Sequence, residues 1–137
     1  MAQRWLLKTE PESYSYADLE REGKAVWDGV SNNAALKNLR SMAKGDEVII
    51  YHTGDEKSLV GLAQVTASAY PDPKKDDPKL VVVDLKPKRK LPRAVTLAEV
   101  KANPKLKDFD LVRLPRLSVM PVSEEQWKLL ADMAGVK

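Results

Sequence analysis

Apolar and polar residues alternate over short stretches of this chain, and the pattern predicts several strands separated by short helices. Strand character is found where apolar runs or period-two alternation are bounded by Gly, Pro or Asp. The predicted strands are residues 4–8, 47–52, 59–70 and 80–90, with brief extended pieces at 25–27 and 119–122. Gly54-Asp55 separates the second strand from the third, which is typical of a hairpin connection.

Capping-box sequences mark where helices begin. In such a box a Ser or Thr and a polar residue three positions later satisfy each other's backbone N–H groups. Boxes of this kind open three predicted helices, at 15–23, 96–103 and 123–135. A fourth helix, at 33–42, has its apolar residues on one face and Asn32 or Asn33 as its cap.

The order of these elements predicts an α+β fold. No repeat or interdomain linker interrupts the 137 residues, so we expect residues 1–137 to form one domain. Several long strands with scattered helices indicate a curled, mostly antiparallel sheet or small barrel with helices packed outside.

Composition excludes several kinds of chemistry. The chain has no cysteine and one histidine, so it offers neither a thiolate metal site nor an HExxH pattern. Its carboxylates lack EF-hand spacing, and its six glycines stand singly, outside any phosphate- or dinucleotide-binding loop. We expect no metal and no cofactor. Without a signal peptide or a long apolar run, a cytoplasmic protein with no membrane partner is expected.

Charge is unevenly divided along the chain. Residues 1–70 hold 8 basic and 10 acidic side chains, whereas residues 71–137 hold 15 and 10, for a net charge of +3 overall. The densest basic stretch, residues 86–93, has five basic side chains and no acid. Two interpretations remain open: a surface for a polyanion, or an edge strand that lysines keep soluble.

Hydrolytic catalysis has little support in the sequence. A Ser or Thr nucleophile needs a base, and His52 is the only histidine, with no Gly-x-Ser-x-Gly elbow in the chain. His52 follows Tyr51 at the end of a predicted strand, where such a pair commonly faces a loop-rimmed opening. We therefore place His52 in a ligand site in preference to the core.

The segment Trp27-Asp28-Gly29-Val30-Ser31-Asn32 is the strongest candidate for a binding site. An aromatic face suits stacking, while Asp28 and Ser31 can read the edge of a planar ligand. The alternative is a core tryptophan followed by a turn and the Asn32 helix cap. By contrast, Trp5 opens an apolar strand and Trp127 has helical spacing with Leu130, so both are assigned to the core.

The chain resembles the EVE domain family, which has a PUA-like fold, from about residue 4 to about residue 133. The motifs that carry the resemblance are Trp5-Leu6-Leu7-Lys8-Thr9-Glu10-Pro11, Trp27-Asp28-Gly29-Val30, Gly45-Asp46, Tyr51-His52, Val60-Gly61, Tyr70-Pro71-Asp72 and Arg116-Leu117-Ser118-Val119. The resemblance implies the barrel topology, which periodicity alone does not.

EVE domains are in turn similar to YTH domains, which insert a modified RNA base into an aromatic pocket. The likeness implies that Trp27 stacks on a flipped base and that Thr9, Glu10 and Asp28 face its polar edge. Ser31 and Asn32 join this ligand site, and Lys8 and Arg116 would hold the flanking phosphates. Tyr14, Tyr51 and Leu62 remain alternatives for the second wall of the pocket.

Three positions depart from the family pattern. Ser31 stands where EVE sequences often have Arg, Ala34 where they have Gln, and Pro115 where they have Gly. The first two changes remove side-chain donors, and Pro115 stiffens the approach to Arg116. A changed ligand preference is therefore expected.

The function expected from these observations is non-catalytic binding of nucleic acid through a modified base, with a modified pyrimidine in DNA favoured over RNA. One alternative is a small hydrolase of modified nucleosides, in which burial raises the pKa of Glu10 or Asp28 for acid–base work. The other is a sensor of a free nucleotide or other planar metabolite. A basic rim around the pocket would favour the polymer.

Overall fold

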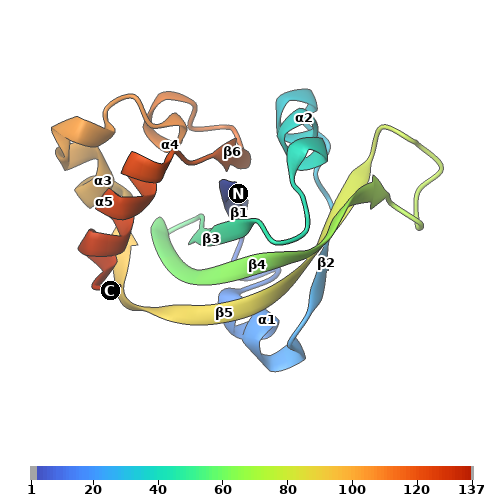
Figure 1. The fold of residues 1–137 in the computed structure, drawn as a ribbon, viewed down its shortest axis with the longest axis horizontal. Coiled ribbons are helices and arrows are strands. Elements are labelled where there is room, and N and C mark those ends of the chain that lie inside the picture. Colours follow the sequence, from blue (N-terminus) through green and yellow to red (C-terminus); the bar gives the residue numbers. More distant parts are fainter. Residues whose placement is uncertain (1–2, 137) are drawn as a thin grey trace.

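A computed structural model describes residues 3–136, which form one curled six-stranded sheet with helices around it (Figure 1). The strand order is β2-β5-β4-β3-β1-β6. The strands are β1 (Arg4–Thr9), β2 (Ala25–Trp27), β3 (Glu47–His52), β4 (Ser58–Pro71), β5 (Val81–Thr96) and β6 (Val119–Pro121). Among these, β1 and β3 pair in parallel and every other pair is antiparallel. The predicted fold class, a curled and mostly antiparallel PUA-like sheet, is confirmed.

The helices surround this sheet on several sides. They are α1 (Tyr16–Glu22), α2 (Asn33–Ser41), α3 (Leu97–Ala102), α4 (Asp110–Arg113) and α5 (Glu124–Ala134), with a 3₁₀ turn η1 at Pro104–Leu106. Figure 1 shows α3, α4 and α5 gathered at one end of the sheet, with α1 and α2 on opposite sides of it. The three predicted capping boxes are present, at Ser15, Thr96 and Ser123.

Two regions differ from the prediction. Strand β5 continues beyond residue 90 to Thr96, through Pro87 and Pro92. Proline is tolerated there because β2 pairs only with residues 83–85 of β5, so the rest of that edge needs no N–H donor. The predicted loop after residue 103 contains η1 and α4, and this segment buries Leu106, Phe109 and Leu111.

The glycine near the start of β4 makes room for a helix to pack on the sheet. A Cβ at Gly61 would lie 2.3 Å from Cζ of Tyr16, the first residue of α1. The buried Tyr16 ring therefore covers Gly61, and its hydroxyl donates to the Leu62 carbonyl at 2.6 Å. This contact fixes α1 against β4 and so positions the segments on either side of α1.

Candidate functional site

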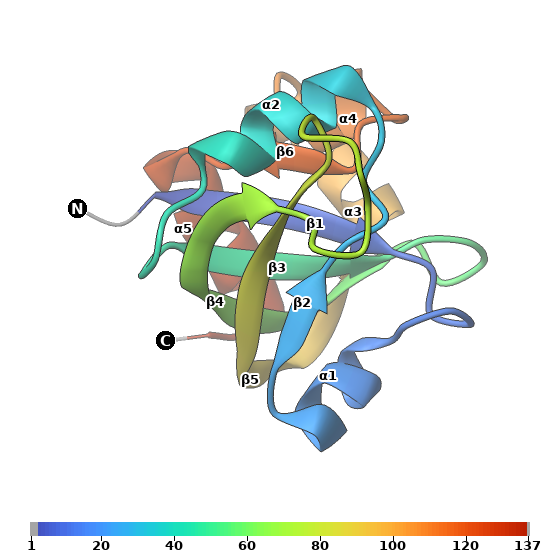
Figure 2. The same ribbon diagram turned by 90° about the vertical axis from the view of Figure 1, so that its right-hand side faces the viewer.

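A cavity of about 520 Å³ opens between the end of β1, the turn that follows it and strand β2. Its walls come from separate parts of the chain: Thr9, Ser13, Tyr14, Glu22, Lys24, Ala25, Val26, Trp27, Asp28 and Lys74. Figure 2 faces this side of the molecule, with β2 between α1 and the loop that joins β4 to β5. The cavity size is within the range of small-molecule sites, roughly 300–1,000 Å³.

Trp27 is placed at the cavity by the last pairing of β2, opposite Val83. The chain then turns at Gly29, whose φ of 78° is a left-handed conformation that glycine adopts without strain. Only 7% of Trp27 is exposed, so a small part of its ring reaches the cavity. Asp28 is exposed on the same wall.

Tyr14 forms the second aromatic wall. Its ring meets Trp27 edge-on, with centroids 6.1 Å apart and planes at 82°. The Tyr14 carbonyl accepts from the Thr9 hydroxyl at 2.7 Å, and the Tyr14 hydroxyl donates to Glu22 at 3.0 Å. Burial, and then the neighbouring Glu22 carboxylate, raise the pKa of Tyr14 to about 12. The phenol therefore stays protonated at neutral pH.

The other two aromatic or apolar candidates for this wall lie elsewhere. Tyr51 is buried in β3, with the Lys8 ammonium 5.7 Å from its ring centroid. Leu62 packs against the core from β4. Neither lines the Trp27 cavity.

A second hollow, of about 340 Å³, adjoins the first and shares Thr9 with it. It is lined by Lys8, Thr9, Glu10, Thr53, Pro115, Arg116 and Ser118. The Lys8 ammonium donates to the Pro115 carbonyl at 2.8 Å, and burial lowers the pKa of Lys8. Arg116 is exposed and forms no ion pair within residues 3–136. The structure thus brings Lys8, Glu10 and Arg116 beside the cavity of Trp27, Asp28 and Thr9.

Ser31 and Asn32 lie outside the Trp27 cavity. Asn32 is the N-cap of α2, and its side-chain oxygen accepts from the backbone N–H groups of Ala34 and Ala35 at 3.0 and 3.1 Å. Ser31 lines a separate hollow of about 170 Å³ with Gly29 and Asp72. Neither residue lines the Trp27 cavity, so the structure gives Asn32 the capping role that was the alternative.

His52 requires a correction. It is buried, its Nε2 accepts from the Tyr16 backbone N–H at 2.9 Å, and its Nδ1 lies 3.0 Å from Glu56. The acceptor role of Nε2 places the ring proton on Nδ1, facing Glu56. Both nitrogens are therefore engaged in holding α1 and the β3–β4 hairpin together, and His52 lines none of the hollows described here.

The sequence pattern of the EVE domain matches residues 3–133, which is nearly the whole chain. This chain belongs to the EVE domain family. Thymocyte nuclear protein 1 from Mus musculus is 32% identical over 163 aligned residues, covering 94% of this chain and 72% of that protein.

Two solved structures extend this relationship to the fold. A crystal structure of a protein from Agrobacterium tumefaciens superposes with a TM-score of 0.95 at 38% identity, covering 98% of this chain and 94% of that one. The human THYN1 protein, in complex with DNA containing 5-methylcytosine, gives a TM-score of 0.90 at 30% identity and 99% coverage of both chains.

Several cavity residues of this EVE domain were missed in the sequence. Tyr14 was one of three alternatives, and Ser13, Glu22, Lys24 and Lys74 were not singled out. Lys74 comes from the β4–β5 loop, whose position relative to β2 no local pattern encodes. The one sequence signal that favoured Tyr14 was its place in a polar turn, six residues after Lys8, directly after the family's first motif.

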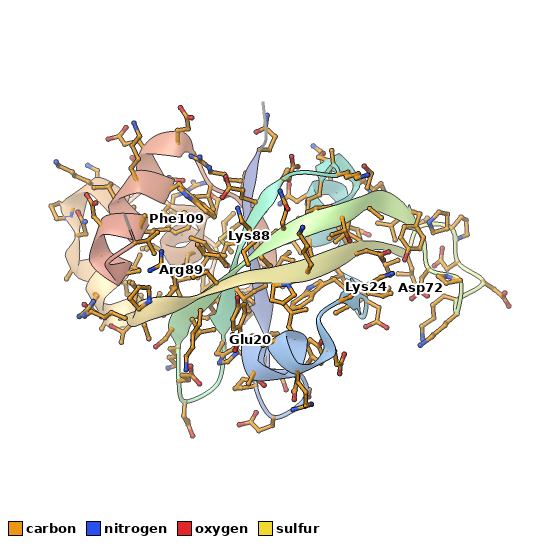
Figure 3. The ribbon with its side chains drawn as sticks, turned by 60° about the horizontal axis from the view of Figure 1, so that its bottom comes forward. Glu20, Lys24, Asp72, Lys88, Arg89 and Phe109 are labelled. Atoms are coloured by element: carbon orange, nitrogen blue, oxygen red, sulfur yellow. The ribbon has the colours of Figure 1, made fainter. Side chains whose placement is uncertain are left out.

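The densest basic stretch lies apart from the cavity. Figure 3 places Lys24 and Asp72 toward the end of the sheet from which the β4–β5 loop projects, and Lys88 and Arg89 further along β5. Lys88 pairs with Glu47 at 3.7 Å, and Arg93 pairs with Glu99. The positive charge on the cavity itself comes from Lys24 and Lys74, opposed by Glu22 and Asp28.

Within residues 3–136 no group of three His, Asp or Glu side chains is arranged to hold a metal ion. In the same part of the chain, none of the helices combines the length and apolar character needed to cross a bilayer.

Proposed function

We propose that this EVE domain is a non-catalytic DNA-binding module that holds one modified base in the Trp27 cavity. The observation that carries the proposal is the aromatic corner, in which Trp27 and Tyr14 stand at 82° beside the Asp28 carboxylate. The relative in complex with 5-methylcytosine DNA supports the ligand class, because the fold is shared over 99% of the chain in that structure.

Stacking supplies the affinity for the base. A base rotated out of a duplex loses its stacking partners, and an aromatic side chain returns about 1–3 kcal/mol per base. A base lying flat against one ring of a perpendicular pair presents its edge to the other. The corner between Trp27 and Tyr14 therefore fixes both the plane and the depth of the base.

The polar groups of the cavity favour a cytosine derivative. Ionised carboxylates only accept hydrogen bonds, and Asp28 and Glu22 both line the cavity. Cytosine has an exocyclic amine that donates, whereas thymine has an oxygen at the same position. Thymine would leave a carboxylate facing an acceptor, which costs about 1–3 kcal/mol if the pair is desolvated. We infer that the base is a modified cytosine.

Two cations in the hollow beside the cavity favour a nucleic-acid strand over a free nucleotide. Lys8 and Arg116 line that hollow together with one acid, Glu10. In the cavity itself two lysines are balanced by two acids. One nucleotide has a phosphate on one side of its base, but a strand has phosphates on both sides. Lys8 and Arg116 are proposed to contact these flanking phosphates, which would position the strand without reading its sequence.

Catalysis is not expected at this site. The hydroxyl groups available in the cavity belong to Thr9, Ser13 and Tyr14, and the one histidine of the chain is engaged elsewhere. A hydroxyl nucleophile needs a base within hydrogen-bond reach. The remaining route is a carboxylate, either Asp28 in the cavity or Glu10 in the adjoining hollow.

The proposal is tested with duplexes that differ at one position, which holds 5-methylcytosine, cytosine or thymine. Fluorescence anisotropy should give the tightest binding for 5-methylcytosine, with a matched RNA and free 5-methylcytosine nucleotide binding more weakly. Trp27→Leu should weaken binding by about 1–3 kcal/mol, whereas Trp27→Phe, which keeps an aromatic face, should lose less. Equal affinity for all three duplexes would overturn the proposal.

Turnover is assayed in the same samples. Mass spectrometry of modified nucleosides and oligonucleotides after long incubation should recover the substrates unchanged. Multiple turnover that disappears in Asp28→Asn or Glu10→Gln would replace the binding module with an enzyme.

A further inference from the structure

The segment between α4 and β6 presents an apolar tip to solvent. Leu114 is 43% exposed, and among residues 3–136 the one other large hydrophobic side chain exposed to this degree is Val26, which lines the Trp27 cavity. Pro115 follows Leu114 and is also exposed. Arg113 and Arg116 flank this pair, and Arg113 is paired with Asp110 at 2.9 Å. One cation without an ion pair within residues 3–136, Arg116, therefore borders an uncovered apolar surface.

This tip is rigidly held. The Leu114 N–H donates to the Asp110 carbonyl at 2.7 Å, and the Leu117 N–H donates back to the Leu114 carbonyl at 3.0 Å. Lys8 binds the Pro115 carbonyl, and Leu117 is buried below it. Because backbone bonds and Leu117 already anchor the turn, the exposed Leu114 side chain adds little to its stability.

One hollow separates this tip from the Trp27 cavity. Thr9 lines both that cavity and the hollow bounded by Pro115 and Arg116. On its other side, Leu114 borders a largely apolar hollow of about 430 Å³ that reaches Ala34 at the start of α2. In Figure 2 the segment joining α4 to β6 reaches the same side of the molecule as the end of β1.

A flipped base leaves an unstacked gap in the duplex. Proteins that open base steps commonly insert an apolar side chain such as Leu or Pro there, which offsets part of the lost stacking. A neighbouring arginine without an acidic partner, such as Arg116, suits a phosphate beside such a gap. A single-stranded ligand has no such gap and gains nothing from an apolar wedge.

We propose that Leu114 and Pro115 form a wedge that enters the duplex at the position vacated by the base held at Trp27. This inference rests on the proposed function, and it specifies the ligand as double-stranded DNA. Arg116 contacts a phosphate next to the gap. The wedge and the cavity act on two different parts of one ligand, so their contributions are separable.

The experiment compares Leu114→Ser with wild type on one 5-methylcytosine oligonucleotide, presented single-stranded and as a duplex. Leu114→Ser should weaken duplex binding about tenfold, or about 1.4 kcal/mol, and change single-strand binding less than about twofold. Leu114→Met keeps an apolar tip and should restore duplex binding. Val26→Ser, a matched change in the cavity wall, should weaken both forms alike.

A fluorescent base analogue opposite the 5-methylcytosine reports insertion directly. Its emission should rise when wild type or Leu114→Met binds, and rise less with Leu114→Ser. Thermal unfolding checks that each variant is folded; if Leu114→Ser is not, Leu114→Ala takes its place.

Each remaining outcome is decisive. If Leu114→Ser weakens neither form, or both equally, the wedge is wrong while modified-base binding stands. If wild type shows no preference for 5-methylcytosine in either form, the proposed function fails, and the wedge fails with it.

Discussion

Two tryptophans of similar burial have very different surroundings. Trp5 is 6% exposed and Trp27 is 7% exposed. The indole N–H of Trp5 donates to the buried Asp46 carboxylate at 2.9 Å, and Asp46 also accepts from the backbone N–H groups of Gln3 and Ala43. Trp27 instead lines an open cavity with Tyr14 and the exposed Asp28.

Exposure alone therefore does not separate a core residue from a site residue. What separates them is whether the surrounding polar groups are already satisfied. Around Trp5 both oxygens of Asp46 accept hydrogen bonds from the protein, as expected of a buried carboxylate that has to be compensated. Around Trp27 the carboxylate of Asp28 has no protein partner among the residues described, and it remains available to a ligand.

The largest expected effect is on stability. Trp5→Ala should lower the free energy of unfolding by about 3–5 kcal/mol, because it leaves a core cavity and removes the partner of Asp46. Trp27→Ala should cost less, since part of its ring lines the open cavity and no buried carboxylate loses a partner. Chemical denaturation measures both, and equal losses would make Trp27 an ordinary core residue.

Asp46→Asn tests the hydrogen bonds beside Trp5 with almost no change in side-chain volume. Replacing the carboxylate by an amide removes one acceptor from three donors, so we expect a loss of about 1–3 kcal/mol in the free energy of unfolding. Asp28→Asn, the matched change at the cavity, should leave stability nearly unchanged. A comparable loss in both variants would show that the cavity carboxylate is also structural.

Tyr14 and Tyr16, on either side of Ser15, show the same difference between cavity and core. Tyr16→Phe removes a hydroxyl that donates to a backbone carbonyl in the interior, and should cost about 0.5–1.5 kcal/mol of stability. Tyr14→Phe should leave the unfolding free energy almost unchanged, because its hydroxyl contacts the exposed Glu22. Thermal or urea unfolding of the two variants checks the difference.

Alkaline titration addresses the same tyrosines. Their folded pKa values of about 12 exceed the ordinary value of 10, so the stabilising contribution is complete below pH 10 and is lost as pH rises toward 12. Glu22→Gln removes a nearby negative charge and should lower the pKa of Tyr14 alone. Tyrosinate absorbance, read in variants that lack one tyrosine, identifies the group. An unchanged Tyr14 pKa would mean that burial alone sets it.

The smallest expected effect is a change in salt dependence. Arg116→Ala should reduce the slope of log affinity against log salt concentration by about one phosphate contact, whichever base the oligonucleotide carries. Lys101→Ala, an exposed lysine on α3, is the matched control and should leave the slope unchanged. A loss confined to the modified base would instead assign Arg116 to base reading.

Local chemistry made most of the secondary structure predictable. Capping boxes at Ser15, Thr96 and Ser123 act within four residues, so the sequence shows them directly. The continuation of β5 was missed because it depends on where β2 stops pairing with it, which only the tertiary structure determines. The α4 turn was missed because it has no side-chain cap and is held by the packing of Phe109 and Leu111.

The candidate site was predictable only in part, for similar reasons. Trp27, Asp28 and Thr9 belong to family motifs, and the structure places them on one cavity. Lys74 lies 47 positions from Trp27, and no periodicity links the two. His52 was misassigned because its two hydrogen-bond partners, Tyr16 and Glu56, lie in other segments.

The prolines of β5 have a consequence for association between copies of the chain. Beyond residue 85 this strand has a free edge, and a long free edge can recruit a strand from another molecule. Pro87 and Pro92 have no N–H to offer to such a strand, and Lys86, Lys88 and Lys90 surround them with like charge. The outermost strands, β2 and β6, are three residues each. The sheet is thereby protected against edge-to-edge aggregation.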